Sequence, residues 1–468
     1  MKPVAKDFIP ASRIALADDH LRKAIFAGAM RPYLQAAERW AETSGRERLR
    51  TQAREARVRA LRKLPELLER LEKNLLSRGA KVLWAADAEE ANRLIAQECV
   101  ARDARLVVKG KSMVTEETGL NQHLERAGME VVESDLGEFI IQLAGETPSH
   151  IIAPVLHKSK DAIAKLFSER LGLPLTDDPA EMMRAARSYL REKFLRADVG
   201  ISGVNLAVAE TGGLVLVTNE GNGRMVTTLP RTHIAVMGLE RVVESWKDLA
   251  SIVQLLPRVA TGQSVSTYVS IIHGPRQQGE PDGPEELVLV IVDNGRSAIL
   301  NSDYAESLLC IRCGACLNAC PVYRRVGGHA YGWVYPGPIG SVISPLLLGL
   351  AEAPDLPMAS SLCGACRDAC PVKIDLPEML VRLRAEPPMR RKGGRMMSLG
   401  MKMWRYVMLH PSVYRWGLAA TRFLTRPWHG EDGSLRGLPG PASAWLESRD
   451  LPAPAPRSFR ALYRGPER

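Results

Sequence analysis

Seven of the eight cysteines in the chain fall into two short runs. The first run comprises Cys310, Cys313, Cys316 and Cys320, with Pro321 directly after it. Thiolates at this spacing are typical ligands of cubane iron–sulfur clusters, because three of them bind one cube while the fourth reaches a second cube. The residue types and their spacing therefore predict electron-transfer chemistry.

The second run repeats this pattern with one change. Cys363, Cys366, Cys370 and Pro371 stand at the expected intervals, but Ser360 occupies the place of the first cysteine. One of the two clusters is therefore predicted to be one thiolate short. Three outcomes are open: a three-iron cluster, a four-iron cluster completed by Ser360 or by another oxygen or nitrogen ligand, or a cube with one exposed iron.

The two runs are expected to share their ligands. In two-cluster ferredoxins, the last cysteine of each run binds the cluster held by the other run. The expected ligands are Cys310, Cys313, Cys316 and Cys370 for cluster one, and Cys320, Cys363 and Cys366 for cluster two.

Other chemistries of cysteine fit this pattern less well. A structural zinc site uses two C-x-x-C pairs about 15 to 20 residues apart, whereas Cys316 and Cys363 are 47 positions apart. A thioredoxin-type pair needs one C-x-x-C only, and disulfides are not expected in a chain without a secretory signal. Iron–sulfur ligation remains the favoured interpretation.

Length and composition bound the remaining possibilities. The 468 residues allow about three domains of about 150 residues each. No apolar run reaches the roughly 18 residues that a membrane-spanning helix needs, and residues 1–12 contain no continuous apolar segment of a signal peptide. We therefore expect a soluble protein in a reducing cytoplasm.

The positive charge is concentrated in one stretch. Of the net charge of +10, residues 387–430 contribute nine Lys or Arg and no acid. Apolar residues such as Met401, Trp404 and Trp416 are interleaved with the basic ones, which predicts a basic amphipathic helix. We expect it to bind an acidic partner; packing on its own domain and contact with an anionic membrane surface are the alternatives.

No nucleic-acid-binding motif accompanies the stretch. The residues that follow, 430–468, are rich in Pro and Gly and are expected to be extended.

The rest of the chain reads as an α/β protein preceded by a helical arm. Residues 13–78 carry leucines at helical spacing and predict two or three helices that pack on the next domain or on a partner. From residue 81 onward, short apolar runs alternate with amphipathic segments such as 88–101, which predicts a largely parallel sheet over about residues 60–300. The expected strands are 81–86, 105–108, 129–132, 150–153, 213–217, 234–237, 267–272 and 287–292.

Two polar loops flank the expected strand at 213–217. They are Glu210–Gly213 and Thr218–Arg224, and loops at opposite ends of one strand cannot form one small site. Asn219, Glu220 and Arg224 are nevertheless candidates for binding a ligand in a pocket, with simple turn geometry as the equal alternative.

Other loops and residues of the α/β part offer weaker signals. Gly110-Lys111-Ser112 is not a phosphate-binding loop, because Arg105 stands where that motif needs a glycine. The charged residues Lys109, Lys111, Glu116 and Glu117 either bind an anion or are solvated. The lone histidines His233 and His273 are expected to be structural. No catalytic triad, pair of catalytic acids or full dinucleotide fingerprint is visible, so no catalytic residue is assigned.

Two segments accompany the cysteine runs. Residues 330–357 form a long insert between the runs, and its aromatic and apolar content predicts a lid or docking surface that excludes water from the clusters. A short helix is expected at 377–385.

The sequence resembles the iron–sulfur lactate utilization protein B family over most of its length. The resemblance rests on conspicuous segments in the α/β part, on both cysteine runs and on the segments that follow them. These segments are Lys109–Glu117, Asp198–Asn205, Ala209–Gly212, Asn219–Arg224, His233–Gly238, His329–Tyr335 and the C-terminal extension.

The resemblance implies a fold and a role. It implies an α/β lactate-utilization domain, similar to the sugar-isomerase and CoA-transferase group, followed by an α-helical ferredoxin-like domain with two clusters, one [4Fe-4S] and one [4Fe-4S] or [3Fe-4S]. The expected division is a helical arm at 1–60, the α/β domain at 61–300, the iron–sulfur domain at 301–386 and a C-terminal extension at 387–468. The missing cysteine at Ser360 resembles the family pattern.

The implied role is electron transfer in the NAD-independent oxidation of L-lactate to pyruvate. The family implies two partners in this work, one cysteine-rich protein and one protein made of the lactate-utilization domain alone. Three alternatives stay open: the α/β domain is itself the catalyst of a 2-hydroxy-acid oxidoreductase, it is a scaffold for a partner, or the substrate is another 2-hydroxy acid such as glycolate.

Overall fold

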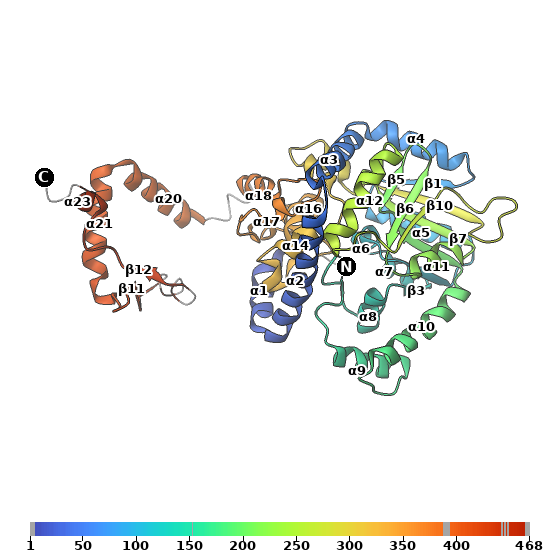
Figure 1. The fold of residues 1–468 in the computed structure, drawn as a ribbon, viewed down its shortest axis with the longest axis horizontal. Helices are drawn as coiled ribbons and strands as arrows, with labels where there is room; N and C mark the ends of the chain where they lie inside the picture. The colour runs from blue at the N-terminus through green and yellow to red at the C-terminus, as the bar shows by residue number, and fades with distance from the viewer. Residues whose placement is uncertain are drawn as a thin grey trace. The chain divides into compact units, whose positions relative to one another are not determined.

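The computed structural model describes residues 5–151, 153–386, 394–440 and 449–463, together with Ser443 and Leu446. These residues form two compact units, one that ends at residue 389 and one that begins at residue 390 (Figure 1). Three further segments lie outside the described residues: 387–393 of the basic stretch, 441–448 apart from Ser443 and Leu446, and all of 464–468. The expected boundaries near residues 60, 300 and 386 stay predictions.

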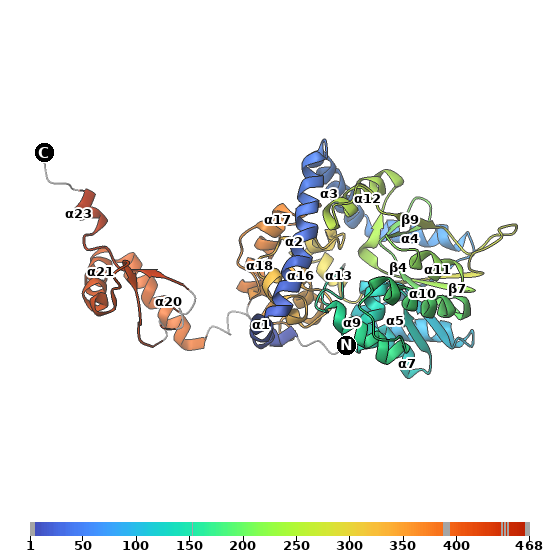
Figure 2. The ribbon, with the colours of Figure 1, turned by 60° about the horizontal axis from the view of Figure 1, so that its bottom comes forward.

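The N-terminal arm is divided into more helices than expected. After the short 3-10 helix η1 (Ala5–Asp7), the structure has α1 (Phe8–Ala17), α2 (Asp19–Glu42), α3 (Arg46–Arg62) and α4 (Leu64–Leu76). Asp18 begins α2 because its side chain accepts a hydrogen bond from the Leu21 amide. The leucines of α4 bury one face against the α/β part, whereas α2 contacts α14 (Ala315–Ala319) and α15 (Tyr323–Val326) of the cysteine-bearing part. In Figure 2, α2 lies beside the part of the chain that carries α16 (Gly337–Leu348), α17 (Ala365–Asp368) and α18 (Leu376–Ala385).

A six-stranded parallel sheet forms the centre of the α/β part, as the sequence predicted. Its strands are apolar on both faces because helices or a second sheet cover each face. In spatial order the strands are β1 (Lys81–Ala85), β10 (Glu286–Val292), β7 (Thr232–Gly238), β4 (Val199–Gly203), β2 (Leu106–Lys109) and β3 (Glu130–Glu133).

Alternate residues of these strands point to different layers. On β7, Ile234 and Val236 pack toward helices α5 to α7, whereas Ala235 and Met237 pack toward α4 and a second sheet. Helices α8 to α11 cover the remaining part of the sheet around β2 and β3. The helices are α5 (Ala88–Val100), α6 (Met113–Thr118), α7 (Leu120–Arg126), α8 (Leu136–Ala144), α9 (Lys160–Leu171), α10 (Pro179–Arg196) and α11 (Asn222–Thr228).

A second, four-stranded sheet is a feature that the sequence did not predict. Its order is β8 (Val242–Val243), β5 (Leu206–Val208), β6 (Gly213–Thr218) and β9 (Tyr268–Ile272), and two of its three pairings are antiparallel. The expected strands at 213–217 and 267–272 therefore belong to this sheet. Helix α12 (Trp246–Ala260) packs against it and against the arm.

The strand expected at 150–153 is wrong. The described residues of this segment form a loop, and Ile152 lies outside the described residues. Its polar groups are bound to the cysteine-bearing part instead of to a strand: His150 Nε2 lies 3.2 Å from Asn318 Oδ1, and the Tyr323 hydroxyl donates to the Ser149 carbonyl. These bonds remove the backbone from any sheet ladder.

Short helices make up the cysteine-bearing part, and the expected helix at 377–385 is present as α18. The insert at 330–357 is buried: Tyr331, Trp333 and Tyr335 join α16 in the core around the cysteines. The elements are α13 (Arg296–Leu300), η3 (Ala305–Leu309), α14 (Ala315–Ala319), α15 (Tyr323–Val326), η4 (His329–Tyr331), α16 (Gly337–Leu348), η5 (Leu356–Met358), α17 (Ala365–Asp368) and α18 (Leu376–Ala385).

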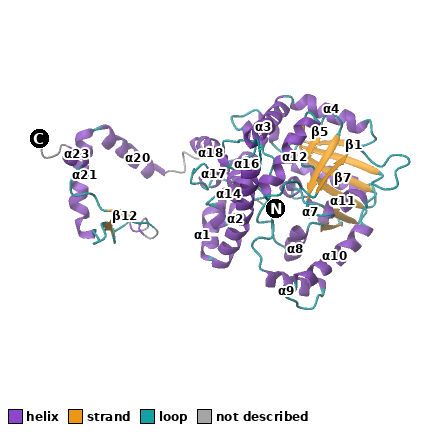
Figure 3. Cartoon of the chain, in the orientation of Figure 1, coloured by secondary structure: helices purple, strands orange, loops and turns teal. Residues whose placement is uncertain are grey.

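The C-terminal unit contains two amphipathic helices in place of the single one expected (Figure 3). They are α20 (Gly394–Leu409) and α21 (Pro411–Thr425), followed by η6 (Arg426–Trp428). The part expected to be extended holds an antiparallel pair, β11 (Ser434–Leu435) with β12 (Leu451–Pro452), and helix α23 (Phe459–Tyr463). Among the described residues, every helix is too short or too polar to cross a membrane.

Candidate iron–sulfur site and the adjoining cavity

The two cysteine runs adopt the same backbone conformation. Arg312 and Leu362 hold corresponding places and both have positive φ angles, 59° and 56°. Gly314 and Gly364 also correspond, with φ angles of 72° and 85°. Because non-glycine residues seldom adopt positive φ, the repetition at Arg312 and Leu362 indicates that both loops are shaped for the same task.

Ser360 presents its hydroxyl where the other loop presents a thiol. The Arg312 amide donates to Cys310 Sγ at 3.4 Å, and the corresponding Leu362 amide donates to Ser360 Oγ at 3.1 Å. The serine oxygen therefore has the same local hydrogen bond as the cysteine sulfur that it replaces.

One group of thiols gathers around Cys313. Burial raises the pKa of the Cys313 thiol, and so do the neighbouring thiols of Cys310 and Cys370. The pKa of Cys370 is raised to about 11, first by burial and then by Cys310, against backbone hydrogen bonds that lower it. Cys316 interacts with all three, and burial is the largest cause of its raised pKa.

The other thiols form a second group. Burial raises the pKa of Cys366 to about 12, and the thiols of Cys320 and Cys363 raise it further. Cys316 of the first group also interacts with Cys366, so the groups are neighbours. In this group Cys363 is exposed and Cys320 and Cys366 are buried, whereas in the first group Cys310 and Cys316 are half-buried and Cys313 and Cys370 are buried. Cys363 therefore places one edge of the second group at the surface.

The first group surrounds a cavity with about 370 Å³ of empty space. In the part of the chain that the structure describes, no three Cys, His, Asp or Glu side chains converge tightly enough to hold one metal ion. The cavity is lined instead by four thiols and an apolar wall that includes Ile151, Ile339 and Ile374. Four thiols and apolar walls are the donor set and surroundings that an iron–sulfur cube requires.

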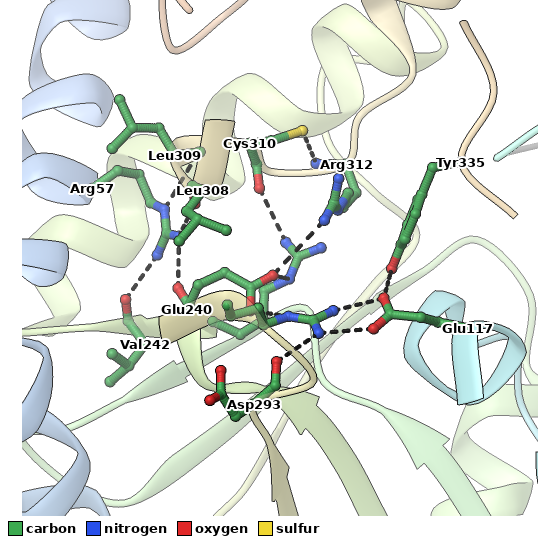
Figure 4. A network of polar contacts seen from close by, with 12 residues as sticks. Arg57, Glu117, Glu240, Val242, Asp293, Leu308, Leu309, Cys310, Arg312 and Tyr335 are labelled. Atoms are coloured by element: carbon green, nitrogen blue, oxygen red, sulfur yellow. Dashed lines mark hydrogen bonds and ion pairs between the residues drawn. The ribbon is translucent and has the colours of Figure 1, made fainter. Parts of the chain in front are cut away.

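A buried ionic network joins this site to the α/β part (Figure 4). Arg296 of α13 binds Glu117 of α6 at 2.7 Å and Glu240 at 2.8 Å, and the Tyr335 hydroxyl donates to Glu117 at 2.6 Å. Burial alone would raise the pKa of Glu240, but Arg296, Arg241 and other charged neighbours lower it to about 2. Both carboxylates are therefore ionised.

The same network reaches the first cysteine loop. The Arg241 guanidinium donates to the Cys310 carbonyl at 3.4 Å, while Arg312 lies 3.9 Å from Glu240 and 4.3 Å from the centre of the Tyr335 ring. The network contains more arginines than acids. It holds Arg57, Arg241, Arg296 and Arg312 together with the acids Glu117 and Glu240. Asp293 joins it by accepting from Arg296 through its backbone carbonyl. The arginines outnumber these acids, which leaves a positive excess beside the thiols.

Arg57 links the arm, the second sheet and the approach to the first cysteine. From α3, its guanidinium donates to the carbonyls of Val242 and Glu240 at 2.8 and 2.6 Å and to that of Leu308 at 2.9 Å. Burial is the main cause that lowers the pKa of Arg57, to about 10. The residue stays charged at neutral pH and fixes three segments that are distant in sequence.

A larger cavity adjoins the first group of thiols, with about 1470 Å³ of empty space including the part open to solvent. Cys313, Arg312 and Arg241 line it from the cysteine side, and Lys111 and Asn205 line it from the α/β side. This cavity connects the loops of the α/β part with cluster-one ligands expected from the sequence.

The structure separates the three pocket candidates. Asn219 and Glu220 line the larger cavity, whereas Arg224 lines a different hollow and lies over the Tyr268 ring at 5.5 Å. Burial, together with Asp135, raises the pKa of Glu220. A ligand role for any of them stays a prediction.

Several charged and histidine residues have structural partners. Lys109 and Glu117 are buried and therefore not solvated; Lys109 pairs with Glu133 at 2.7 Å. His233 is buried with its Nε2 at 2.7 Å from Ser202 Oγ, as expected of a structural residue.

Models of protein families match three parts of the chain. The LUD domain matches residues 68–292, a 4Fe-4S dicluster domain matches 306–374, and the C-terminal domain of lactate utilisation protein B matches 382–467. A relative from Shouchella clausii named lactate utilization protein B is 46% identical over 450 residues, which cover 96% of this chain and 94% of the relative. The chain belongs to the lactate utilization protein B family.

Other proteins of the lactate utilization protein B family show the same extent of similarity. The relative from Bacillus velezensis is 48% identical over 93% of this chain and 91% of its own length. A crystal structure of a DUF162 family protein from Deinococcus radiodurans aligns with 17% identity and a TM-score of 0.28, covering 49% of this chain and 98% of that one.

Sequence reasoning found the cysteines but missed the arginines around them. Arg312 lies inside the first cysteine run, and that position was the available signal. Arg57, Arg241 and Arg296 come from three separate segments and follow no periodic pattern, so nothing local pointed to them.

Proposed function

We propose that the protein is a cytoplasmic electron-transfer subunit in the oxidation of L-lactate to pyruvate. In this role it works with a cysteine-rich partner and a partner made of the lactate-utilization domain alone. The conversion of lactate to pyruvate releases two electrons and two protons, and iron–sulfur clusters carry electrons one at a time. Cluster ligation by seven cysteines requires reduced thiols, which suits a reducing compartment.

The observation that carries this proposal is the gathering of seven thiols into two neighbouring groups within a dicluster domain. We assign Cys310, Cys313, Cys316 and Cys370 to cluster one and Cys320, Cys363 and Cys366 to cluster two. For cluster two, the matched hydrogen bonds of Cys310 and Ser360 support the Ser360 oxygen as the fourth ligand.

The positions of the expected ligands support one direction for electron transfer. Cluster one would lie beside the larger cavity, because its ligand Cys313 lines that cavity. Cluster two would lie nearer the surface, because its ligand Cys363 is exposed. Electrons that enter at the cavity side would therefore leave at the Cys363 side toward an external acceptor.

The larger cavity also favours a second candidate function. A cavity at an electron-transfer site is where a substrate would bind, so the α/β part is the candidate catalyst of a 2-hydroxy-acid oxidoreductase, acting on lactate or glycolate. Under this alternative the chain accepts electrons from the hydroxy acid without a partner.

Spectroscopy of the anaerobically purified chain tests both functions. Iron and sulfide counting with electron paramagnetic resonance, before and after dithionite, should give two reducible clusters. Reduction by L-lactate only when the partners are present supports the electron-transfer role. Reduction by L-lactate with this chain alone would assign catalysis to the α/β part.

Single substitutions test the ligand assignment. Cys313→Ser should abolish the signal of cluster one, and Cys99→Ser is the matched control because Cys99 is a buried cysteine of α5 outside both runs. Ser360→Ala should convert the signal of cluster two to that of a cluster with a different ligand set. Full iron content and an unchanged signal in Cys313→Ser would refute the assignment.

A further inference from the structure

Arg312 carries donors that the protein does not use. Its side chain is 7% exposed, and its Nε and Nη1 atoms find no hydrogen-bond acceptor among the described residues. Its nearest charged partner, Glu240, is 3.9 Å away, beyond hydrogen-bond distance. Leaving a buried donor of a charged group unpaired is energetically costly, so an acceptor from outside the chain is expected.

Two cavities meet at Arg312. Arg312 lines the cavity among the cluster-one thiols and also the larger cavity. Arg241 adds positive charge on the cysteine side of the larger cavity, while Asp135, Glu220 and Lys111, which pairs with Glu138 at 2.7 Å, line its α/β side. The part of the wall next to Cys313 is therefore cationic.

The geometry points to a binding site for a small carboxylate in the larger cavity, anchored on the Arg312 guanidinium beside Cys313. A guanidinium fork matches the two oxygens of a carboxylate and binds them with charge-assisted hydrogen bonds. Asn205, Asn219 and Glu220 supply polar groups for the rest of such a molecule. The choice of a 2-hydroxy acid as the ligand rests on the proposed function; the carboxylate site itself does not.

The neighbouring arginines have other partners and would not serve as the anchor. Arg296 binds Glu117 and Glu240, Arg57 binds backbone carbonyls, and Arg241 binds the Cys310 carbonyl and lies 3.5 Å from Glu240. Arg312 alone among these four has two buried nitrogens without a partner among the described residues. A purely electrostatic role beside cluster one would need its charge but no carboxylate.

Titration calorimetry of the anaerobic, full-length holoprotein with L-lactate and with propionate tests the site. Both should bind, and Arg312→Gln should weaken both at least tenfold while iron and sulfide content stay as in the unaltered chain. Arg312→Lys keeps the charge without the fork, so its affinity for both carboxylates should lie between that of the unaltered chain and that of Arg312→Gln. Arg187→Gln is the matched control, because Arg187 is exposed on α10, and it should bind as the unaltered chain does.

A spectroscopic readout separates ligand binding from a structural role. L-lactate should shift the paramagnetic resonance signal of reduced cluster one, because Cys313 lines the cavity, and Arg312→Gln should abolish that shift. If Arg312→Gln loses iron, Lys111→Gln on the α/β wall tests the same cavity. This variant should weaken the binding of L-lactate at least threefold.

Three results would overturn the inference: no binding of either carboxylate to the holoprotein, binding unchanged in both Arg312→Gln with full iron and Lys111→Gln, or a shift that persists in Arg312→Gln. Its failure differs from that of the proposed function. In one such result, L-lactate fails to bind in this cavity and still reduces the clusters when the partners are present. That result would contradict the carboxylate site but would leave the electron-transfer role intact.

Discussion

Buried arginines determine the charge around the cysteines of cluster one. The Arg241 guanidinium donates to the Cys310 carbonyl, and the charges of Arg312 and Arg57 interact with the Cys310 thiol. Glu240 lies between Arg296 and Arg312. Without negative charge nearby, the burial of so many cations would strongly destabilise the fold. Their excess over the acids is what a negatively charged cluster with four thiolates would neutralise, so the arginines and the cluster stabilise each other.

His233 predicts how stability depends on pH. Burial lowers its pKa to about 4 from an ordinary value of 6.5. Between these values the unfolded chain binds the proton and the folded chain does not, so stability falls as the pH drops below 6.5. At pH 5.5 this one group should cost about 1 kcal/mol relative to pH 7.5.

Thermal unfolding of the anaerobic protein at pH 7.5 and 5.5 measures this effect. His233→Gln keeps a polar group near Ser202 but cannot titrate, so its midpoint should fall less on acidification than that of the unaltered chain. Equal acid sensitivity of the two proteins would contradict the prediction.

At the scale of residues, the sequence predicts candidate ligands because their spacing is local. Cys310 to Cys320 lie within one loop and helix, so the spacing alone indicates cubane ligation. Glu117 and Arg296 come together only because β2 and β10 end at the same edge of a parallel sheet. Pairs of this kind depend on the topology and cannot be found from either segment alone.

Strand β4 and helix α11 pack at unusually close range. A Cβ atom built on Gly200 of β4 would overlap the Val226 carbonyl of α11. Because that obstacle is backbone, it cannot rotate away. Gly200→Ala should therefore lower the free energy of unfolding by about 1–3 kcal/mol, measured as a fall in the thermal midpoint.

Gly221 provides the matched control in the same region. It precedes α11 with an ordinary φ of −77°, and a Cβ atom there would meet nothing within 4 Å. Gly221→Ala should keep the free energy of unfolding within about 0.5 kcal/mol of that of the unaltered chain. Equal stability of Gly200→Ala would show that α11 can move away from the sheet.

The same packing explains why the sequence missed β4. Its residues include Gly200, Ser202 and Gly203, small residues that leave room for α11 and Ser112 but break the apolar run by which strands are recognised. β10, with an uninterrupted run from Leu287 to Val292, was predicted correctly. The strand expected at 150–153 was wrong for the opposite reason: the apolar residue Ile151 belongs to the core of the cysteine-bearing part and not to the sheet.

At the scale of the whole molecule, the C-terminal unit has an unusual surface. Met403, Trp404, Trp416 and Phe423 of α20 and α21 are all more than half exposed. Exposed apolar side chains of this size, set among basic residues, mark an interaction surface. The proposed partners of the lactate-oxidising complex are the candidates to cover it, and an anionic membrane surface is the alternative.

Trp416, which is 78% exposed, tests this surface in the full-length chain. Trp416→Glu should leave the thermal midpoint and iron content unchanged, since no packing is lost, but should weaken association with the partner proteins at least tenfold in pull-down titrations. Leu175→Glu is the matched control, because Leu175 is a 69% exposed apolar residue of the other unit, and it should bind normally. Unchanged partner binding by Trp416→Glu, together with loss of binding to anionic vesicles, would assign the surface to a membrane instead.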